Sequence, residues 1–241
     1  MSYSYTHGGY LIGSAQELTS ANQAELISRI FSNATSTDDE GRVLSGRGTV
    51  KHIRLGELGS FVIKTYLRGG LLRKLPWAVY LGIGKFRSQS EFEVLQRLLS
   101  LGVRVPKPLA WIGKGSFFKK AWLVLEEIIG ERSLADLSIE FEDLAQRYCR
   151  EAAAEVRKLI RAKIWHVDLH PGNVLVDLNG AVFIIDFDKA TEFRGSQNRL
   201  RDLYLCRWRR AVLKYELPAY LIELFAAEVR QDYDASCRVT A

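Results

Sequence analysis

The stretch "WHVDLHPGNVLVDLNGAVFIIDFD", Trp165 to Asp188, decides the fold of this chain. It contains two runs rich in β-branched residues, 174–176 and 181–186, separated by a short polar segment. That segment carries Leu178-Asn179-Gly180, and Asn-Gly between such runs is the strongest local signal for a β-hairpin. The stretch therefore predicts a loop, a strand, a tight turn and a second strand.

Three oxygen-bearing side chains should meet at one end of this hairpin. Asp168 and Asn173 precede the first strand and Asp186 ends the second, so all three leave the same end of a two-stranded ribbon. The arrangement suits phosphoryl transfer, because Mg²⁺ prefers hard oxygen ligands and a separate carboxylate can orient the attacking hydroxyl. The spacing His-x-Asp-x-x-x-x-Asn from His166, followed by Asp-Phe, resembles the catalytic and metal-binding loops of protein-kinase-like enzymes.

The first half of the chain is predicted to be rich in β-strands. The runs 49–55 and 60–67 form a hairpin around a glycine-containing turn, with Lys64 in the middle of the second strand, and 122–128 is a third long apolar strand. Between them, 88–101 has the apolar spacing of a helix. On that helix Glu91 borders the apolar stripe and Glu93 faces away.

The second half is predicted to be mainly helical, with apolar stripes at helical spacing over 141–164 and 198–215. Together the halves indicate an α+β, bilobal protein-kinase-like fold. Its small β-rich N-terminal lobe, 1–127, contains one main helix and a basic-apolar insertion at 68–87. The C-terminal lobe, 128–241, is helical and carries the catalytic and metal-binding loops.

A fold of this kind also needs groups that hold a nucleotide. A strand lysine paired with a helix glutamate holds the phosphates, and Lys64 and Glu91 fit these positions. A shortened glycine turn, "SGRG" at 45–48, precedes the lysine strand, and the backbone at the end of the third strand, about 126–128, is expected to meet the adenine. The expected nucleotide-binding residues are Gly46, Gly48, Lys64, Glu91, Glu126 and Ile128.

Beyond these loops, most of residues 46 to 215 resembles the 3-deoxy-D-manno-octulosonic acid (Kdo) kinases and related lipopolysaccharide core kinases. The resemblance rests on six segments in order and on a basic helix. They are "GRG" (46–48), "YLRGGLL" (66–72), "FRSQSEFEVLQRLLSLGVRVPKPLAW" (86–111), "GERSLADL" (130–137), "HVDLHPGNVLVD" (166–177), "IIDFDKA" (184–190) and the helix beginning "QNRLRDL" (197–203).

The resemblance implies ATP-dependent phosphorylation of a Kdo hydroxyl on a lipid A precursor. It also implies that Asp168 is the catalytic base, that Asn173 and Asp186 bind Mg²⁺, and that Lys64 and Glu91 hold the ATP phosphates. The implied location is cytoplasmic, peripheral at the inner face of the bacterial inner membrane, where the partners are the Kdo-bearing acceptor and the anionic membrane surface.

Composition agrees with an anionic partner. The net charge is +6 and the pI is about 9.2. No apolar run reaches the roughly 18 residues that a membrane-spanning helix needs, and no secretory signal opens the chain. Three widely spaced cysteines, interpreted as small apolar fillers, indicate neither a disulfide framework nor a zinc site. The insertion, which alternates cations with apolar residues, is expected to contact the acidic sugar or the bilayer.

Other interpretations remain open from sequence alone. The chain could be another kinase of this fold, acting on a lipopolysaccharide heptose, a small molecule or a protein, or a non-catalytic nucleotide- or membrane-binding module. Val167 replaces the arginine of the protein-kinase catalytic loop, which argues against control through a phosphorylated activation loop. Asp188 replaces the glycine of Asp-Phe-Gly and no Ala-Pro-Glu motif follows, which argues against a peptide-binding platform and so against protein acceptors. No motif that reads nucleic acid is present. Glu91 could simply close a capping box that begins at Ser88.

His166 is expected to support its loop by hydrogen bonding. The three neighbouring polar residues have local roles in the same interpretation: His170 and Asp177 are turn residues, and Asp188 lies behind the residues that bind metal.

Overall fold

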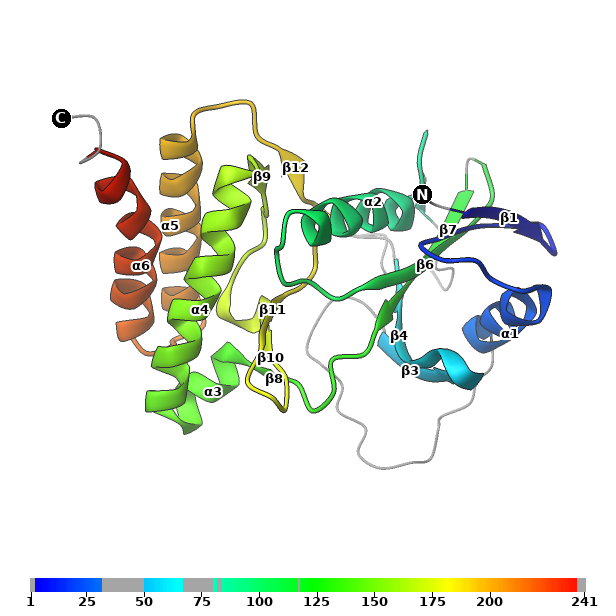
Figure 1. Ribbon diagram of the computed structural model, residues 1–241, viewed down its shortest axis with the longest axis horizontal. Coiled ribbons are helices and arrows are strands. Elements are labelled where there is room, and N and C mark those ends of the chain that lie inside the picture. The colour runs from blue at the N-terminus through cyan, green and yellow to red at the C-terminus, as the bar shows by residue number, and fades with distance from the viewer. Residues whose placement is uncertain (1–2, 32–49, 67–79, 82–83, 117, 238–241) are drawn as a thin grey trace. The chain divides into compact units, whose positions relative to one another are not determined.

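The computed structural model describes most of the chain, and Figure 1 shows its elements. The residues outside the description are 1–2, 32–49, 67–79, 82–83, 117 and 238–241. The chain forms two compact units. Unit 1 comprises Met1–Gln96 with Lys107–Glu127, and unit 2 comprises Arg97–Pro106 with Ile128–Ala241. Unit 1 is rich in strands and unit 2 is mainly helical, which confirms the expected α+β class with a β-rich first part and a helical second part.

Unit 1 is built on a seven-stranded sheet in which every pairing is antiparallel. Its strands are β1 (Tyr3–His7), β2 (Tyr10–Ser14), β3 (Val50–Leu55), β4 (Gly59–Thr65), β5 (Tyr80–Leu81), β6 (Pro108–Lys114) and β7 (Phe118–Glu126). The order across the sheet is β1-β2-β6-β7-β4-β3, and β5 also pairs with β7. The predicted hairpin of β3 and β4 is present, joined by a short 3-10 turn at Gly56–Leu58.

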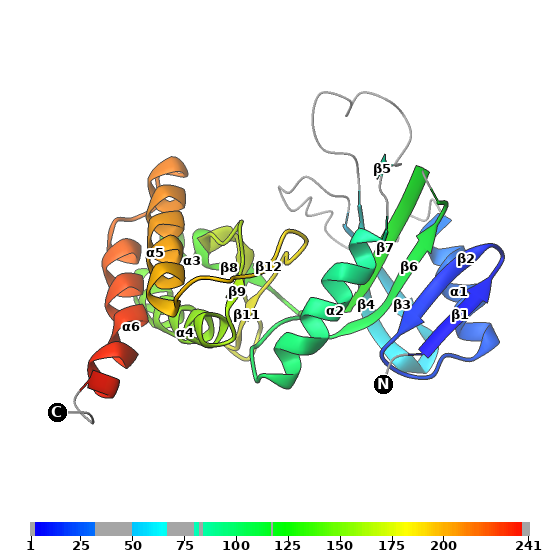
Figure 2. The same ribbon diagram turned by 90° about the horizontal axis from the view of Figure 1, so that it is seen from above.

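Alternating side chains from these strands form the core of unit 1. Ile53, Ile63 and Val124 are buried on neighbouring strands, and the helix α1 (Ser20–Phe31) adds Leu26 to the same cluster. Figure 2 shows α1 beside the sheet. The second helix, α2 (Arg87–Ser100), buries Phe92, Leu95 and Leu98, so the apolar stripe predicted for this segment is confirmed.

Among its described residues, unit 2 has four α-helices and two small sheets. The helices are α3 (Leu134–Glu140), α4 (Glu142–Arg161), α5 (Gln197–Lys214) and α6 (Tyr220–Cys237), and Figure 1 shows α4, α5 and α6 side by side. The strands are β8 (Arg132–Ser133), β9 (Ile164–Trp165), β10 (Val174–Val176), β11 (Val182–Ile184) and β12 (Thr191–Glu192). β8, β10 and β11 form one sheet, and β9 pairs with β12 in the other.

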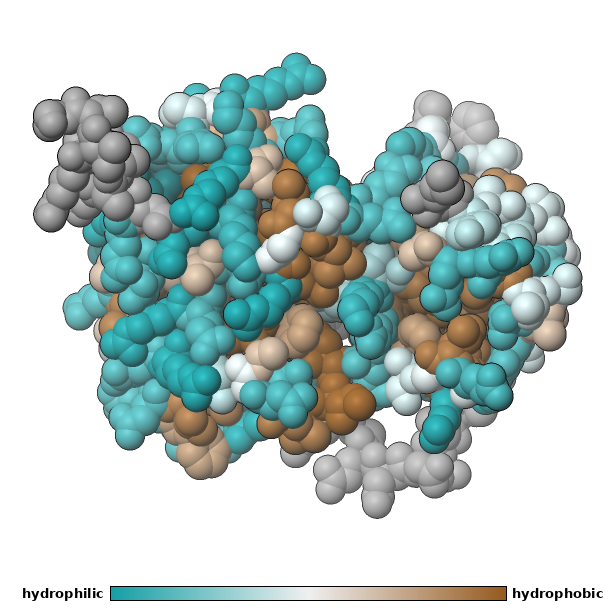
Figure 3. Space-filling view, viewed as in Figure 1, coloured by the Kyte–Doolittle hydropathy of each residue, from teal (hydrophilic) through white to brown (hydrophobic). Residues whose placement is uncertain are grey.

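Aromatic packing joins the helices of unit 2. Trp208 on α5 stacks flat on Phe225 of α6, with ring centroids 4.1 Å apart and an interplanar angle of 6°. The indole nitrogen of Trp208 also donates a hydrogen bond to the carbonyl of Leu221. Ser133 and Ser196 cap the first turns of α3 and α5 by accepting backbone N–H groups, as expected for serine at this position. On the face shown in Figure 3, hydrophilic residues cover much of the helical unit.

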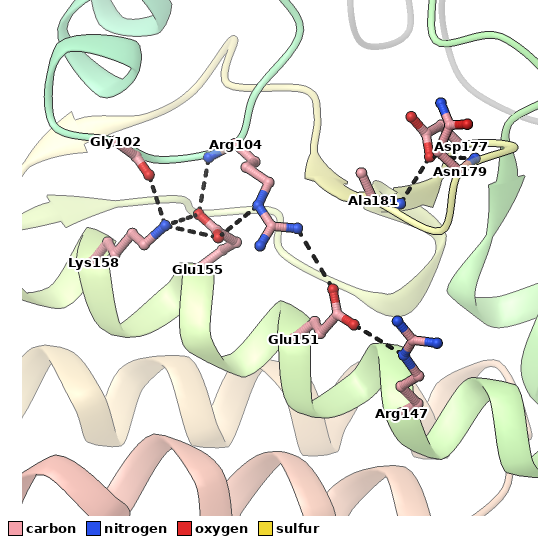
Figure 4. Close-up of polar contacts among 9 residues, drawn as sticks. All are labelled: Gly102, Arg104, Arg147, Glu151, Glu155, Lys158, Asp177, Asn179 and Ala181. Atoms are coloured by element: carbon pink, nitrogen blue, oxygen red, sulfur yellow. Dashed lines mark hydrogen bonds and ion pairs between the residues drawn. The ribbon is translucent and has the colours of Figure 1, made fainter.

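A buried carboxylate explains why residues 97–106 belong to unit 2. Glu155 on α4 accepts the backbone N–H of Arg104 at 2.9 Å and two contacts from Lys158. Lys158 in turn donates to the carbonyl of Gly102, as Figure 4 shows. These contacts, and a further ion pair between Arg104 and Glu151, tie the segment after α2 to α4. The sequence assigns this segment to lobe 1–127, so the units differ from the predicted lobes here.

Several elements were missing from the prediction, namely the helices α1, α3 and α6 and the strands β1, β2, β5, β6, β8, β9 and β12. The interpretation of all cysteines as apolar fillers is wrong for Cys206, which is exposed, whereas Cys149 is buried. Lys64 lies next to the end of β4 and not in its middle. Among the described residues, no helix is both long enough and apolar enough to cross a membrane.

Candidate functional site

The predicted hairpin of the opening stretch is present as β10 and β11. Val174 pairs with Ile184 and Val176 pairs with Val182 in antiparallel register. Asp177 closes the turn by accepting the N–H groups of Asn179 at 2.9 Å and Ala181 at 2.7 Å, as shown in Figure 4. The Asp177 carboxylate thus accepts hydrogen bonds from two backbone N–H groups of the turn. This is the turn role predicted for the residue.

His166 is a structural support for the loop that carries Asp168. Its side chain is buried, Nε2 lies 2.8 Å from the carbonyl oxygen of Ile185, and its ring packs edge-on against Phe187 at 4.6 Å. Its backbone N–H donates to the hydroxyl of Tyr204, which itself donates to the carbonyl of Ile164. Burial lowers the pKa of His166, and the nearby carboxylates of Asp186 and Asp168 only partly oppose this. The expected supporting role of this histidine therefore has a direct structural basis.

The backbone brings Asn173 and Asp186 to the same end of the hairpin. The N–H of Ile185 donates to the carbonyl of Asn173 at 3.0 Å, so Asp186 follows a residue that is hydrogen-bonded to Asn173. Asp186 adopts a left-handed backbone conformation with φ of +65°, which is unusual for a residue other than glycine. Such strain is typical of functional positions, where the surrounding structure holds it.

The amide nitrogen of the Asn173 side chain already makes a hydrogen bond within the loop. This Nδ2 donates to the carbonyl of Asp168 at 3.0 Å, and the residue is buried. The amide oxygen is therefore the atom that this side chain can offer to a cation. His170 supports the same loop, because its carbonyl accepts the N–H of Asn173 and its Nδ1 accepts the N–H of Gly172. Burial lowers the pKa of His170 as well, with Asp168 opposing the shift.

Asp168 lies between two cations. Arg207 on α5 places Nη2 2.5 Å from Oδ1 of Asp168, and its Nε donates to the carbonyl of Leu169 at 3.3 Å. Lys189, which follows Phe187 in the next loop, places Nζ 3.9 Å from Oδ2. The side chain of Asp168 is 42% exposed, so its carboxylate remains partly accessible to another molecule.

In unit 1, Lys64 and Glu91 form the ion pair that the sequence predicts. Lys64 Nζ contacts both carboxylate oxygens of Glu91, at 3.0 and 2.9 Å, while the Glu91 side chain is only 1% exposed. The hydroxyl of Tyr66 donates to Oε2 of the same carboxylate. Glu93 is exposed and pairs with Lys85, so the predicted difference between the two acids of α2 is confirmed. Ser88, the residue that would begin a capping box with Glu91, donates a hydrogen bond from its hydroxyl to the carbonyl of Ile112.

The remaining predicted nucleotide-binding residues are placed as follows. Glu126 ends β7, its N–H donates to the carbonyl of Lys107, and its carboxylate pairs with the Lys107 ammonium at 3.1 Å. Ile128 is the first residue of unit 2 after β7 and is half-buried. Gly46 and Gly48 lie outside the described residues. Most of the basic-apolar insertion, 68–87, does so too, apart from the short strand β5 and residues 84–87.

The donor set at the hairpin end fits a hard divalent cation. Asn173 contributes an amide oxygen and Asp186 a carboxylate, and Mg²⁺ is usually bound through one or two carboxylates together with substrate phosphates. In the part of the chain that the structure describes, no group of three or more His, Cys, Asp or Glu side chains could hold a metal. A transition-metal centre built from such groups is therefore not found among these residues, and the oxygen pair is the candidate site.

Three residues of these clusters were not predicted. Tyr66 could have been found, because it lies two residues after Lys64 and therefore on the same face of an extended strand. Lys189 belongs to the segment 184–190, which carries the family resemblance but has no local pattern that indicates a contact with Asp168. Arg207 lies in a basic helix that contains several other arginines, and no spacing in the sequence distinguishes it from them.

The amino-acid sequence was also compared with known proteins, and the matches are to kinases. Residues 39–227 match the model of the "Lipopolysaccharide kinase (Kdo/WaaP) family". A 3-deoxy-D-manno-octulosonic acid kinase of Photobacterium damsela subsp. piscicida is 34% identical over 173 residues, covering 70% of each chain. The enzyme of the same name from Vibrio cholerae is 36% identical over 155 residues, covering 62% of this chain and 65% of its own.

A third protein of that name, from Stenotrophomonas maltophilia strain R551-3, is 34% identical over 181 residues, covering 69% of this chain and 70% of its own length. The family match spans both the Lys64–Glu91 pair and the loops that carry Asp168 and Asp186. This chain therefore belongs to the lipopolysaccharide kinase (Kdo/WaaP) family.

Proposed function

We propose that this chain transfers the γ-phosphoryl group of ATP to a hydroxyl of 3-deoxy-D-manno-octulosonic acid on a lipid A precursor. The family match and the relatives named as kinases of this sugar support the reaction class and the acceptor sugar. The observation that carries the proposal is Asp168. It is a partly exposed carboxylate held on one oxygen by Arg207, in the loop that Asn173 supports.

Asp168 is the general base in this proposal. Oδ1 is engaged by Arg207, so Oδ2 accepts the proton of the acceptor hydroxyl. The hydroxyl oxygen forms a bond to the γ-phosphorus while the bond from that phosphorus to the β,γ-bridging oxygen breaks, and ADP leaves. Asn173 fixes the loop by donating to the carbonyl of Asp168, so the base keeps its orientation relative to the hairpin end.

Asn173 and Asp186 are the proposed ligands of Mg²⁺, which when bound neutralises charge on the nucleotide phosphates. Lys64 is proposed to hold the phosphates, with its ammonium oriented by the buried Glu91 carboxylate. Gly46, Gly48 and the backbone of Glu126 and Ile128 complete the proposed ATP contacts. In protein-kinase-like enzymes catalysis depends chiefly on positioning and charge, which are the contributions that these residues can make.

The acceptor suggests where the protein works. A lipid A precursor is anchored in a bilayer, so we propose peripheral contact with the anionic cytoplasmic face of the inner membrane. The net charge of +6 supports this, as do the exposed arginines of α5, including Arg199, Arg209 and Arg210. The basic-apolar insertion, 68–87, is proposed to contribute to the same contact.

The test is a transfer assay with γ-labelled ATP and Mg²⁺. The acceptors are a Kdo-bearing lipid A precursor, a heptose-bearing core lipopolysaccharide, a generic protein and an aminoglycoside. Transfer to the Kdo glycolipid alone is expected, and Asp168→Ala should lower kcat by a factor of about 100 or more, because proton transfer in the transition state is lost. Binding of ATP to the variant should be unchanged. Preferential labelling of the heptose acceptor or of protein would contradict the proposed acceptor.

A further inference from the structure

The two oxygens of Asp168 have different surroundings. Oδ1 is 2.5 Å from Arg207 Nη2, and the arginine is itself held by the carbonyl of Leu169 and is 26% exposed. Oδ2 faces Lys189 Nζ at 3.9 Å, which is longer than a hydrogen bond. The Lys189 side chain is 58% exposed. Arg207 is therefore a fixed partner of the base, whereas Lys189 is a loosely held cation beside the oxygen that we assign to proton transfer.

A second cation beside a general base needs an explanation. One arginine is enough to orient Asp168, and Lys189 adds charge without a hydrogen bond to the carboxylate. Its position is understandable if it faces an anionic group that approaches together with the acceptor hydroxyl.

The proposed acceptor carries such a group, since 3-deoxy-D-manno-octulosonic acid is a carboxylic acid. Its name places the carboxyl at carbon 1 and removes the hydroxyl of carbon 3, so the nearest ring hydroxyl is only a few bonds from the carboxylate. When such a hydroxyl meets Asp168, two negative charges come close together. Lys189, whose ammonium lies on the Oδ2 side of Asp168, is placed to offset the second of these charges.

Resting on the proposed function, we propose that Lys189 is a specificity-determining residue that binds the carboxylate of the acidic acceptor sugar while Arg207 holds the base. The turn that follows Phe187 presents the lysine, because the N–H of Ala190 bonds to the carbonyl of Phe187 at 2.9 Å and fixes this loop. The ammonium then needs only rotation of its flexible side chain to move from Asp168 to the acceptor.

Steady-state kinetics with two acceptors test the inference. One is the Kdo-bearing lipid A precursor, and the other is the same glycolipid with every Kdo carboxylate converted to the neutral amide. The wild-type protein should prefer the acid by about tenfold in kcat/KM, as expected for one charge-assisted contact. Lys189→Gln should raise the KM for the acid by about tenfold, leave the amide unaffected and so abolish the preference. Lys189→Arg should keep it.

Two controls make the result specific. The KM for ATP should stay within about twofold in Lys189→Gln, and Lys163→Gln, which removes the charge of another exposed lysine of unit 2, should keep the preference for the acid. A preference for the acid that survives in Lys189→Gln would overturn the inference. A raised KM for ATP with an unchanged acceptor KM would also overturn it, by assigning Lys189 to the nucleotide phosphates. Loss of the proposed function itself would look different, since the wild-type protein would then label neither glycolipid.

Discussion

Replacing Lys64 by methionine should destabilise the protein as well as weaken ATP binding. The Glu91 carboxylate is 1% exposed and receives Lys64 on both oxygens, while the Lys64 side chain is 21% exposed. Removing one partner of a buried ion pair typically costs about 3–5 kcal/mol, because a charge is left in a poorly solvated place. Tyr66 still donates to Glu91 in the variant, so we expect the lower end, a loss of about 3 kcal/mol in the free energy of unfolding.

A second substitution tests the cause of this loss. Glu91→Gln in the Lys64→Met background removes the buried charge and keeps an acceptor for the Tyr66 hydroxyl. The double variant should therefore recover about 2 kcal/mol relative to Lys64→Met. The matched control is Lys85→Met, because the Lys85–Glu93 pair is equally short, at 2.7 Å, but its side chains are 60% and 45% exposed. That substitution should change the free energy of unfolding by less than about 1 kcal/mol.

Urea unfolding followed by far-ultraviolet circular dichroism and tryptophan fluorescence measures these differences. Trp111 and Trp122 lie in β6 and β7 of unit 1 and report on the sheet that carries Lys64. A loss below about 1 kcal/mol in Lys64→Met would refute the reasoning. So would a double variant less stable than Lys64→Met, since the loss of stability would then not come from the Glu91 charge that Lys64 balances.

Two further predictions concern unit 2. Because burial lowers the pKa of His166 below 6.5, the imidazole stays neutral in the folded chain while the unfolded chain binds a proton. The free energy of unfolding should therefore fall as pH decreases through 6.5. Urea titration between pH 7.5 and 5.5 measures the slope of this free energy against pH, and the slope should become shallower in His166→Gln by up to about 1.4 kcal/mol per pH unit. Equal slopes in both proteins would contradict this. Glu155→Ala removes the acceptor of the Arg104 N–H and should lower the free energy of unfolding by about 3 kcal/mol, with faster hydrogen exchange at that amide. Gln146→Ala, which removes an exposed hydrogen bond to Glu142 on the same helix, is the control. Unchanged exchange at Arg104 in Glu155→Ala would contradict the role of Glu155 in holding residues 97–106 on α4.

The loop and hairpin of the candidate site could be predicted from sequence because their signals are local. Asn179-Gly180 sets the turn by its backbone preferences, and the side-chain period of two places Asn173 and Asp186 at one end of the ribbon. Helical spacing likewise separates Glu91, which is buried, from Glu93, which is exposed.

The missed strand β6 shows where local signals fail. Its side chains are buried along nearly the whole strand, so no alternation of polar and apolar residues marks it. It also contains Gly113, which reads as a strand breaker. In the structure a Cβ at Gly113 would lie 2.7 Å from the ring of Phe86, so the glycine makes room for an aromatic side chain that lies far away in sequence.

The amino-acid sequence by itself determined the hairpin of the site, the hairpin of β3 and β4, the strand β7 and the helices α2, α4 and α5. It also determined the order of the catalytic and metal-binding motifs and the family to which they point. Only the tertiary structure decided which cation holds Asp168, since Arg207 is 39 residues away and is one of several arginines on α5. It also decided that residues 97–106 pack on α4 through Glu155. Local conformational preferences reach a few residues along the chain, whereas an ion pair or a buried hydrogen bond depends on which distant side chains the packed elements bring within about 3 Å of each other.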